Sequence, residues 1–309
     1  MNKKIITSII SLLLIVPNVA HAKNNKLNNL NSDYTVAVLD TAIDSSISQL
    51  SGKIIYEVCV LEWNSCPNGT SFQEGDGAAK LPTNIITNNG FDHGTNMVGA
   101  LLNSNPNVKI VFVRIIGNTP TGGRQIANEK TVVQALDWVI ANKDKFNISA
   151  VTMSQGHHNL PPLADYCPNT PNTKQRIQSL LNLQVPTFMA VGNNYDYQRI
   201  DWPSCIDEVI AIGALNRYNS INLYSNRDSK RLDFFELGDM NSFGPTGAVK
   251  RLAGTSAAAQ YAAGQWILAK QKKPELSYQQ LMDLIKSTAQ PVSGTKGAAG
   301  IKINIAGIL

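Results

Sequence analysis

The stretch YTVAVLD (residues 34–40) is a largely apolar run that stops on a carboxylate. Runs of the same kind recur at 108–116, 148–154, 185–192 and 208–215. Apolar runs without polar alternation are typical of strands that are buried on both faces, as in a parallel sheet. The stretch 34–40 therefore predicts the first strand of such a sheet.

Helical patterns lie between and after these runs, at 97–103, 129–145, 173–183, 255–270 and 276–289. Strands that alternate with helices favour an α/β fold whose sheet is mainly parallel, with right-handed crossovers. In such folds, chemistry gathers where strands end and loops open. Polar residues that directly follow a predicted strand are therefore candidates for a functional site.

The first 22 residues have the three regions of a secretory signal peptide. Lys3 and Lys4 precede an apolar run at 5–16, and Ala20 and Ala22 form its small-residue end. The apolar run is too short to span a bilayer comfortably. No cysteine follows Ala22 directly, which argues against a lipoprotein. The sequence predicts cleavage after Ala22, a secreted or periplasmic protein, and no stable membrane anchor after cleavage.

Residues 23–33 are predicted to form a short tail, and residues 34–309 a single domain, because no Pro/Gly/Ser-rich linker divides them. Without the signal peptide, 25 Lys and Arg residues stand against 22 Asp and Glu residues. The basic residues are scattered rather than clustered, so the charge pattern gives no reason to expect a nucleic acid as a partner.

Four cysteines form an even set, which in an exported protein is consistent with two disulfides. Sequence alone allows three pairings. We favour Cys59 with Cys66, which closes a short loop, and Cys167 with Cys205, which ties two loops that flank one strand. No Cys-x-x-Cys or His-Glu-x-x-His spacing is present, so the sequence predicts no zinc site.

Histidine is scarce, because only His93, His157 and His158 follow the predicted signal peptide. A serine hydrolase needs a base, and histidine is the usual one because it titrates near neutral pH. Ser154 in TMSQG resembles the nucleophile turn of α/β-hydrolases, but that fold needs an acid and then a histidine further along the chain. No histidine lies beyond His158, so this order argues against Ser154 as the nucleophile.

A second serine, Ser256, lies in LAGTSAAAQYAAG (252–264), where small residues predict a closely packed helix. Serine at a helix start commonly caps it, by accepting a hydrogen bond from an unpaired N–H group. The same position suits a nucleophile, because the N–H groups of a helix start stabilise negative charge. Both interpretations stay open at this stage.

Three more residues complete a candidate set for peptide-bond chemistry. Asp40 ends the first apolar run, His93 precedes a small-residue helix, and Asn193 follows the run at 185–192. Each has an ordinary structural explanation, as a turn carboxylate, a helix cap and a turn former. Their joint occurrence with Ser256 favours a catalytic set.

Five motifs in order resemble the subtilisin-like serine proteases (subtilases) over nearly the whole chain. They are AVLDTAID, HGTNMVGALL, VTMSQG, AVGNN and GTSAAAQYAAG. The resemblance implies a three-layer α/β fold with helices on both faces of a mainly parallel sheet. It also implies a serine-type endopeptidase whose partners are polypeptide substrates. The alternative is a catalytically silent peptide-binding protein on the same scaffold.

The resemblance assigns a role to each matching residue. Ser256 is the expected nucleophile, His93 the base, and Asp40 the carboxylate that orients His93. Asn193 is the expected oxyanion donor, together with the backbone N–H of Ser256. The residues expected to bind the peptide backbone are Ser154, Gln155, Gly156, Ala190, Val191 and Gly192.

The chain also departs from the family pattern. Too few residues lie between Ala22 and Tyr34 for a folded pro-segment, so we expect unaided folding or control by a separate inhibitor or chaperone. No cofactor is required for this chemistry, and the structural calcium that is common in the family has no placeable ligands here. Asp196 and Asp201 are interpreted as exposed loop acids rather than specificity residues. The substituted motif positions are Ala42, Asp92, Asn96, Ala257 and Gln260.

Overall fold

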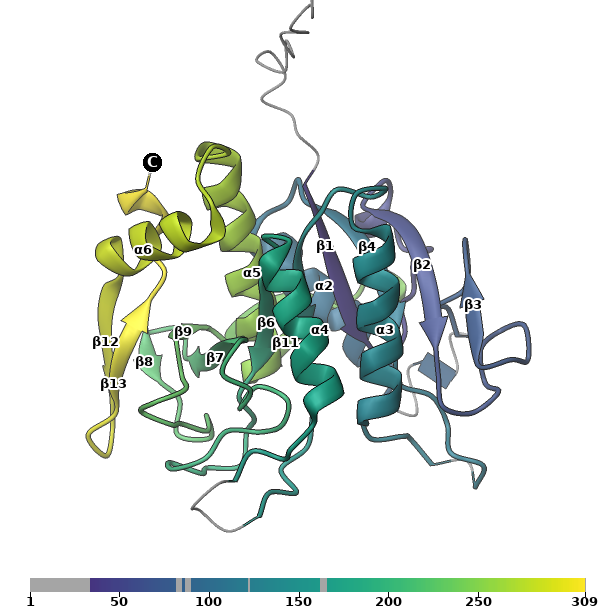
Figure 1. Cartoon of the computed structure of the whole chain (residues 1–309), viewed down its shortest axis with the longest axis horizontal. Helices are drawn as coiled ribbons and strands as arrows, with labels where there is room; N and C mark the ends of the chain where they lie inside the picture. Colours follow the sequence, from purple (N-terminus) through teal and green to yellow (C-terminus); the bar gives the residue numbers. More distant parts are fainter. Residues whose placement is uncertain (1–33, 82–84, 87–89, 122, 162–165, 309) are drawn as a thin grey trace, which may run out of the picture. The chain divides into compact units, whose positions relative to one another are not determined.

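The central sheet contains the five strands that the apolar runs predict. In the computed structural model, β1 (Thr35–Asp40) pairs in parallel with β4 (Lys109–Arg114) on one side and β5 (Ile148–Met153) on the other. The parallel order continues from β5 to β6 (Thr187–Ala190) and then β7 (Ile210–Leu215). Figure 1 shows β1 and β4 side by side, with β6 and β7 further along the sheet. The structure describes residues 34–81, 85–86, 90–121, 123–161 and 166–308.

The predicted signal peptide, its cleavage after Ala22 and the tail at 23–33 lie outside the described residues. No helix within the described ranges is long and apolar enough to cross a bilayer.

The parallel strand β2 (Ile54–Val60) is among the strands that were not predicted from the sequence. It pairs in parallel with β4, and the short β3 (Phe72–Glu74) pairs with β2 in the antiparallel sense at the sheet edge. Polar Glu57 interrupts β2, and the first residues of this strand are partly exposed, so its sequence lacks the continuous apolar run of the strands next to it.

Helices cover both faces of the sheet, as the predicted three-layer fold requires. α3 (Glu129–Asn142) and α4 (Pro171–Asn182) lie side by side across the front of the sheet in Figure 1. The opposite face is covered by α2 (His93–Ser104), α5 (Thr255–Lys272) and α6 (Tyr278–Thr288). α2 begins four residues before the predicted range, and the other four agree within three residues at either end.

Two hydrophobic cores result, one under each helix layer. Ala37 and Leu39 of β1 point into the core shared with α3 and α4. Val36 and Val38 point into the core shared with α2, α5 and α6. Successive strand side chains point to opposite faces, so a strand between two helix layers must be apolar at every position. This explains why the run at 34–40 lacks polar alternation.

The remaining strands extend the sheet beyond β7 or form a separate hairpin. β8, β12 and β13 continue the sheet, β9 pairs with β7, and β10 pairs with β11 in a separate two-stranded sheet. Their bounds are Ser220–Ile221 (β8), Phe234–Leu237 (β9), Asp239–Phe243 (β10), Val249–Ala253 (β11), Gln290–Gly294 (β12) and Ala299–Lys302 (β13).

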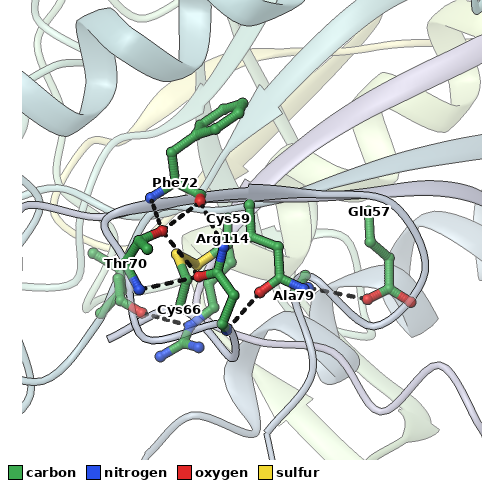
Figure 2. The surroundings of a disulfide bond; sticks show 10 residues. Glu57, Cys59, Cys66, Thr70, Phe72, Ala79 and Arg114 are labelled. Atoms are coloured by element: carbon green, nitrogen blue, oxygen red, sulfur yellow. Dashed lines mark hydrogen bonds between the residues drawn. A yellow bond between two sulfur atoms is a disulfide. The ribbon is translucent and has the colours of Figure 1, made fainter. Parts of the chain in front are cut away.

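Both expected disulfides are present. Cys59 of β2 is bonded to Cys66, and Cys167 before α4 is bonded to Cys205. Figure 2 shows that the Cys59–Cys66 bond closes a loop whose turn is held by the Cys66 N–H, which donates to the Thr70 carbonyl at 3.0 Å. The second bond joins segments 38 residues apart, on either side of β6.

Candidate active site

The candidate residues gather at one edge of the sheet. Asp40 is the last residue of β1, Ser154 follows β5, and Asn193 lies three residues after β6. These three strands are parallel, so their carboxyl ends meet at the same edge. Residues far apart in the chain are thereby brought together.

Asp40 and His93 form a hydrogen-bonded pair. Asp40 Oδ1 lies 2.7 Å from His93 Nδ1, and the Asp40 side chain is fully buried. The backbone N–H of Thr41 donates to the same oxygen at 2.7 Å. The His93 side chain keeps 27% of its surface exposed. The carboxylate thus fixes one nitrogen of the ring, and the partly exposed imidazole keeps its other nitrogen for chemistry.

The loop after β1 is bonded directly to the start of α2, which carries His93. The backbone N–H of Gly94 donates to Thr41 Oγ1 at 2.9 Å, and the backbone N–H of Asp44 donates to Thr95 Oγ1 at 2.9 Å. A Cβ atom on Gly94 would lie 2.3 Å from the Ala42 carbonyl oxygen. Glycine is therefore required here for the helix to approach the loop, and this close approach positions His93 against Asp40.

Ser256 lies in the first turn of α5, and its hydroxyl does not cap the helix. The helix begins at Thr255, with Gly254 as its N-cap residue. Within the described part of the chain, Ser256 Oγ has no hydrogen-bond partner, including His93. Catalytic hydrogen bonds are often unformed before a substrate binds. The capping interpretation of Ser256 is therefore not supported by its contacts.

Asn193 is oriented by the residue beside Ser256. Its Oδ1 accepts hydrogen bonds from the backbone N–H of Thr255 at 3.0 Å and from Thr255 Oγ1 at 3.2 Å. The donors on Thr255 fix which end of the amide is oxygen, so Nδ2 points away from Thr255. Thr255 Oγ1 also accepts from the Gly192 N–H at 3.2 Å. Thr255 thus joins the Asn193 turn to the start of α5.

Ser154 contacts the Ser256 backbone. Ser154 Oγ donates to the Ser256 carbonyl at 3.0 Å, and Gln260 Nε2 donates to Ser154 Oγ at 3.1 Å. Gln260 is fully buried, and α5 continues through this position without a break. Gln260 therefore links the segment after β5 to the turn that carries Ser256.

Gln155 directs its side chain at the Asp40–His93 pair. Its Nε2 lies 3.0 Å from Asp40 Oδ1 and 2.9 Å from His93 Nδ1. Arg124 Nη2 donates to Gln155 Oε1 at 2.6 Å. The resemblance assigned Gln155 to the peptide backbone and did not point to Arg124. Arg124 sits in a loop, and no motif marks it in the sequence.

The segment Asp201–Trp202 packs against both stretches that are predicted to bind the peptide. A Cβ on Gly156 would lie 2.3 Å from the Trp202 carbonyl oxygen, and a Cβ on Gly192 would lie 2.3 Å from the Asp201 carboxyl group. Gly192 also has a φ of 99°, which favours glycine. Ala190, the last residue of β6, is half-buried, and Val191, which follows it, is buried.

The interpretation of Asp196 and Asp201 as exposed loop acids is wrong. Their side chains are only 13% and 15% exposed, and both carboxylates contact His158. His158 Nδ1 lies 2.6 Å from Asp201 Oδ1, and its Nε2 lies 3.3 Å from Asp196 Oδ2. Burial raises the pKa of the Asp201 carboxyl group, although His158 and Asn226 act in the opposite direction. The loop that carries Asp201 packs back against Gly192, and nothing in the local sequence indicates this packing.

The other histidines are engaged away from Asp40. His158 is held by the two carboxylates described above, and His157 stacks on Trp202 with ring centroids 5.1 Å apart. Burial lowers the pKa of His157. Of the three histidines, His93 is the one paired with the strand-terminal Asp40.

Asp92, which directly precedes His93, forms an ion pair with Lys250 and accepts a hydrogen bond from Asn96 at 3.1 Å. Burial acts to raise the pKa of Asp92, but the contacts with Lys250 and Asn96 outweigh it and lower the pKa. Asp92 is thus a paired carboxylate rather than a solvated one. In the described ranges, no group of three or more His, Cys, Asp or Glu side chains is arranged to hold a metal ion.

Solved structures with this architecture are subtilisin-like. A cold-adapted subtilisin-like serine proteinase aligns with a TM-score of 0.63 at 24% identity, covering 89% of this chain and 90% of that one. Proteases from Pseudoalteromonas arctica align with a TM-score of 0.69 at 22% identity, covering 89% and 88%. The fold is therefore the subtilisin-like α/β fold.

The subtilase family model matches residues 31–303, and the chain belongs to this family. It is 25% identical over 263 residues to the cell wall-associated protease of Bacillus subtilis, covering 85% of this chain and 26% of that protein. It is 26% identical over 230 residues to the alkaline protease of Alkalihalobacillus alcalophilus, covering 71% and 55%. The chain thus spans between a quarter and just over half of these two relatives.

Proposed function

We propose that the protein is an exported serine endopeptidase that hydrolyses peptide bonds through Asp40, His93 and Ser256. One observation carries the proposal: the buried carboxylate of Asp40 holds His93 Nδ1 at 2.7 Å, although the two residues are 53 positions apart in the chain. A carboxylate in this position fixes the ring tautomer and stabilises the imidazolium that forms during the reaction.

In the first half of the proposed reaction, His93 Nε2 takes the proton of Ser256 Oγ as this oxygen attacks the scissile carbonyl carbon. The carbonyl oxygen becomes an oxyanion. Asn193 Nδ2 and the Ser256 backbone N–H are the proposed donors to it, and the Thr255 contacts support this orientation of Asn193. His93 then gives the proton to the leaving amine, and the acyl group remains on Ser256.

In the second half, water attacks the acyl carbon while His93 takes one of its protons. The bond between the acyl carbon and Ser256 Oγ then breaks, His93 returns the proton to Oγ, and a free acid leaves as the product. The substrate backbone is proposed to bind beside residues 154–156 and 190–192, largely through main-chain hydrogen bonds. The Ser154 hydroxyl is already bonded to the Ser256 carbonyl, so this residue would act through its backbone.

Export, the fate of residues 1–22 and control of activity belong to the same proposal. Two disulfides support an oxidising compartment, which is either the medium or the periplasm. Control by a separate inhibitor or chaperone and the absence of any required cofactor are also proposed. The intact mass of the exported protein tests export: the expected chain starts at Lys23 and is four hydrogens lighter than its reduced form.

A fluorophosphonate probe tests the chemistry. We expect the probe to label the wild type at Ser256, and His93→Ala to lower the labelling rate by several powers of ten. Ser256→Ala identifies the labelled residue. An intact, folded wild type that takes up no label and cleaves no casein would contradict the proposal and favour a silent peptide-binding protein.

A further inference from the structure

The side chain of Gln155 lies in a closed triangle with the two residues that would activate Ser256. Its Nε2 is 3.0 Å from Asp40 Oδ1 and 2.9 Å from His93 Nδ1, and these two atoms are 2.7 Å apart. The residue is 8% exposed, so water does not compete freely for these contacts. A backbone role in peptide binding does not require any of them.

Arg124 decides which end of the Gln155 amide faces the pair. A guanidinium group can only donate, so the amide atom 2.6 Å from Arg124 Nη2 must be the oxygen. Nε2 then necessarily faces Asp40 and His93 and presents N–H donors to them. The assignment of the amide therefore follows from chemistry rather than from the similar shapes of its two ends.

The amide donor has one productive acceptor in the triangle. When His93 Nδ1 carries a proton, as it must for Nε2 to act as a base, this nitrogen cannot accept from Gln155. The Gln155 amide then donates to Asp40 Oδ1, which also accepts from Thr41 N–H and from His93. Asp40 Oδ2 is buried and has no hydrogen-bond partner among the described residues, so Oδ1 carries these contacts.

We propose that Gln155 is a positioning residue: its side-chain amide, oriented by Arg124, fixes the Asp40 carboxylate and weakens its hold on the charged form of His93. A donor to the carboxylate offsets part of its negative charge. Without this donor, the full negative charge of Asp40 would attract a protonated His93 ring more strongly. The labelling rates measured below rest on the proposed function, whereas the NMR titration of His93 does not.

Other charged groups lie near the Asp40–His93 pair, and the test must leave them in place. Arg124 contacts Gln155, Asp92 precedes His93 on α2 and is paired with Lys250 of β11, and Arg114 lies opposite Asp40 in the register of β1 and β4. Variants at position 155 replace none of these residues, although Gln155→Met also removes the acceptor of Arg124. A shift in pH dependence is then attributable to the lost donor.

The test compares Gln155→Met, which keeps length without a donor, with Gln155→Glu, which replaces the donor by an acceptor. We expect the rate of fluorophosphonate labelling at pH 7 to fall about tenfold in Gln155→Met, because a hydrogen bond to a buried charge is lost. The acid limb of labelling against pH should move up by about half a unit, and further in Gln155→Glu. Gln125→Met is the matched control, since its amide contacts Glu62.

Arg124→Met tests separately whether Arg124 orients the Gln155 amide, because Arg124 is exposed and the change leaves Gln155 in place. We expect a loss of about threefold, and no further loss when Arg124→Met is added to Gln155→Met, since Arg124 acts through Gln155. If the losses of the two single variants multiply in the double variant, the proposed link between them is overturned. Labelling of Gln155→Met within twofold of wild type, with an unshifted acid limb, also overturns the proposal.

The third readout follows the His93 imidazole resonances by NMR in the intact proteins. The midpoint of the His93 titration should rise in Gln155→Met and stay unchanged in Gln125→Met. A wild type that neither labels nor cleaves casein would contradict the proposed function, and the resonance titration then decides on Gln155 alone. Coincident His93 titrations in wild type and Gln155→Met would refute the positioning role.

Discussion

Two serines at the starts of two helices allow catalysis to be separated from helix capping. Ser277 is the N-cap of α6: its Oγ accepts from the Gln280 N–H at 3.3 Å, and Gln280 Oε1 accepts from the Ser277 N–H at 3.0 Å. Ser256 in α5 has no such contacts within the described residues. Ser277→Ala therefore removes a helix cap, whereas Ser256→Ala removes only the proposed nucleophile.

Ser277→Ala should mainly affect stability, whereas Ser256→Ala should mainly affect casein cleavage. Ser277→Ala should lower the free energy of unfolding by about 1 kcal/mol, because the capping box is lost, and leave casein cleavage unchanged. Ser256→Ala should change the free energy of unfolding by less than about 0.5 kcal/mol. Its turnover should fall by about a million-fold, the size of the effect in subtilisin.

Urea unfolding followed by tryptophan fluorescence measures the first quantity, and casein cleavage measures the second. Ser277→Ala is best unfolded in the Ser256→Ala background as well, because an inactive protein cannot digest its own unfolded chains. The reasoning is refuted if Ser256→Ala costs as much stability as Ser277→Ala. It is equally refuted if Ser256→Ala cleaves casein at more than a few per cent of the wild-type rate.

Three further predictions concern stability. Replacing both cysteines of Cys167–Cys205 by alanine should lower the free energy of unfolding by about 4 kcal/mol, against about 2 kcal/mol for Cys59–Cys66, because the first closes 38 residues and the second 7. Equal losses in urea unfolding would contradict this. Burial raises the pKa of Glu236 to about 8, so the stability tied to its protonated form is complete below about pH 4.5 and lost as pH rises through 8. In urea unfolding, the free energy of unfolding of Glu236→Gln should rise relative to that of the wild type between pH 5 and pH 9. A difference between the two proteins that does not change with pH would contradict the raised pKa. Gly94→Ala should cost about 1–3 kcal/mol and slow fluorophosphonate labelling, because its Cβ would lie 2.3 Å from the Ala42 carbonyl oxygen; unchanged stability would exclude that contact.

Much of the fold could be predicted because its signals are local. Strands buried between two helix layers are apolar throughout, and this identified β1, β4, β5, β6 and β7. β2 was missed because the partly exposed residues at its start and the polar Glu57 interrupt its apolar run. Glu57 is buried, and its carboxylate accepts hydrogen bonds from the Ser45 hydroxyl and the Ala79 N–H. The apolar pattern of a strand therefore weakens where the strand is partly exposed, or where a buried polar side chain has hydrogen-bond partners.

The candidate site could be predicted only in part. The sequence alone shows the order of Asp40, His93 and Ser256, the motifs around them and the scarcity of histidine. Whether Ser256 caps its helix, and whether Asp201 is exposed, could not be determined from the sequence. Both depend on which distant segments pack nearby.

Tertiary structure decided the contacts between side chains from separate strands and loops. Gln155 follows β5, Asp40 ends β1 and Arg124 lies in the loop before α3, so no local pattern relates them. They meet because β1 and β5 are parallel neighbours whose carboxyl ends share one edge of the sheet. Local sequence sets which segments become strands and helices, whereas the pairing of those strands sets which polar groups come within hydrogen-bonding distance.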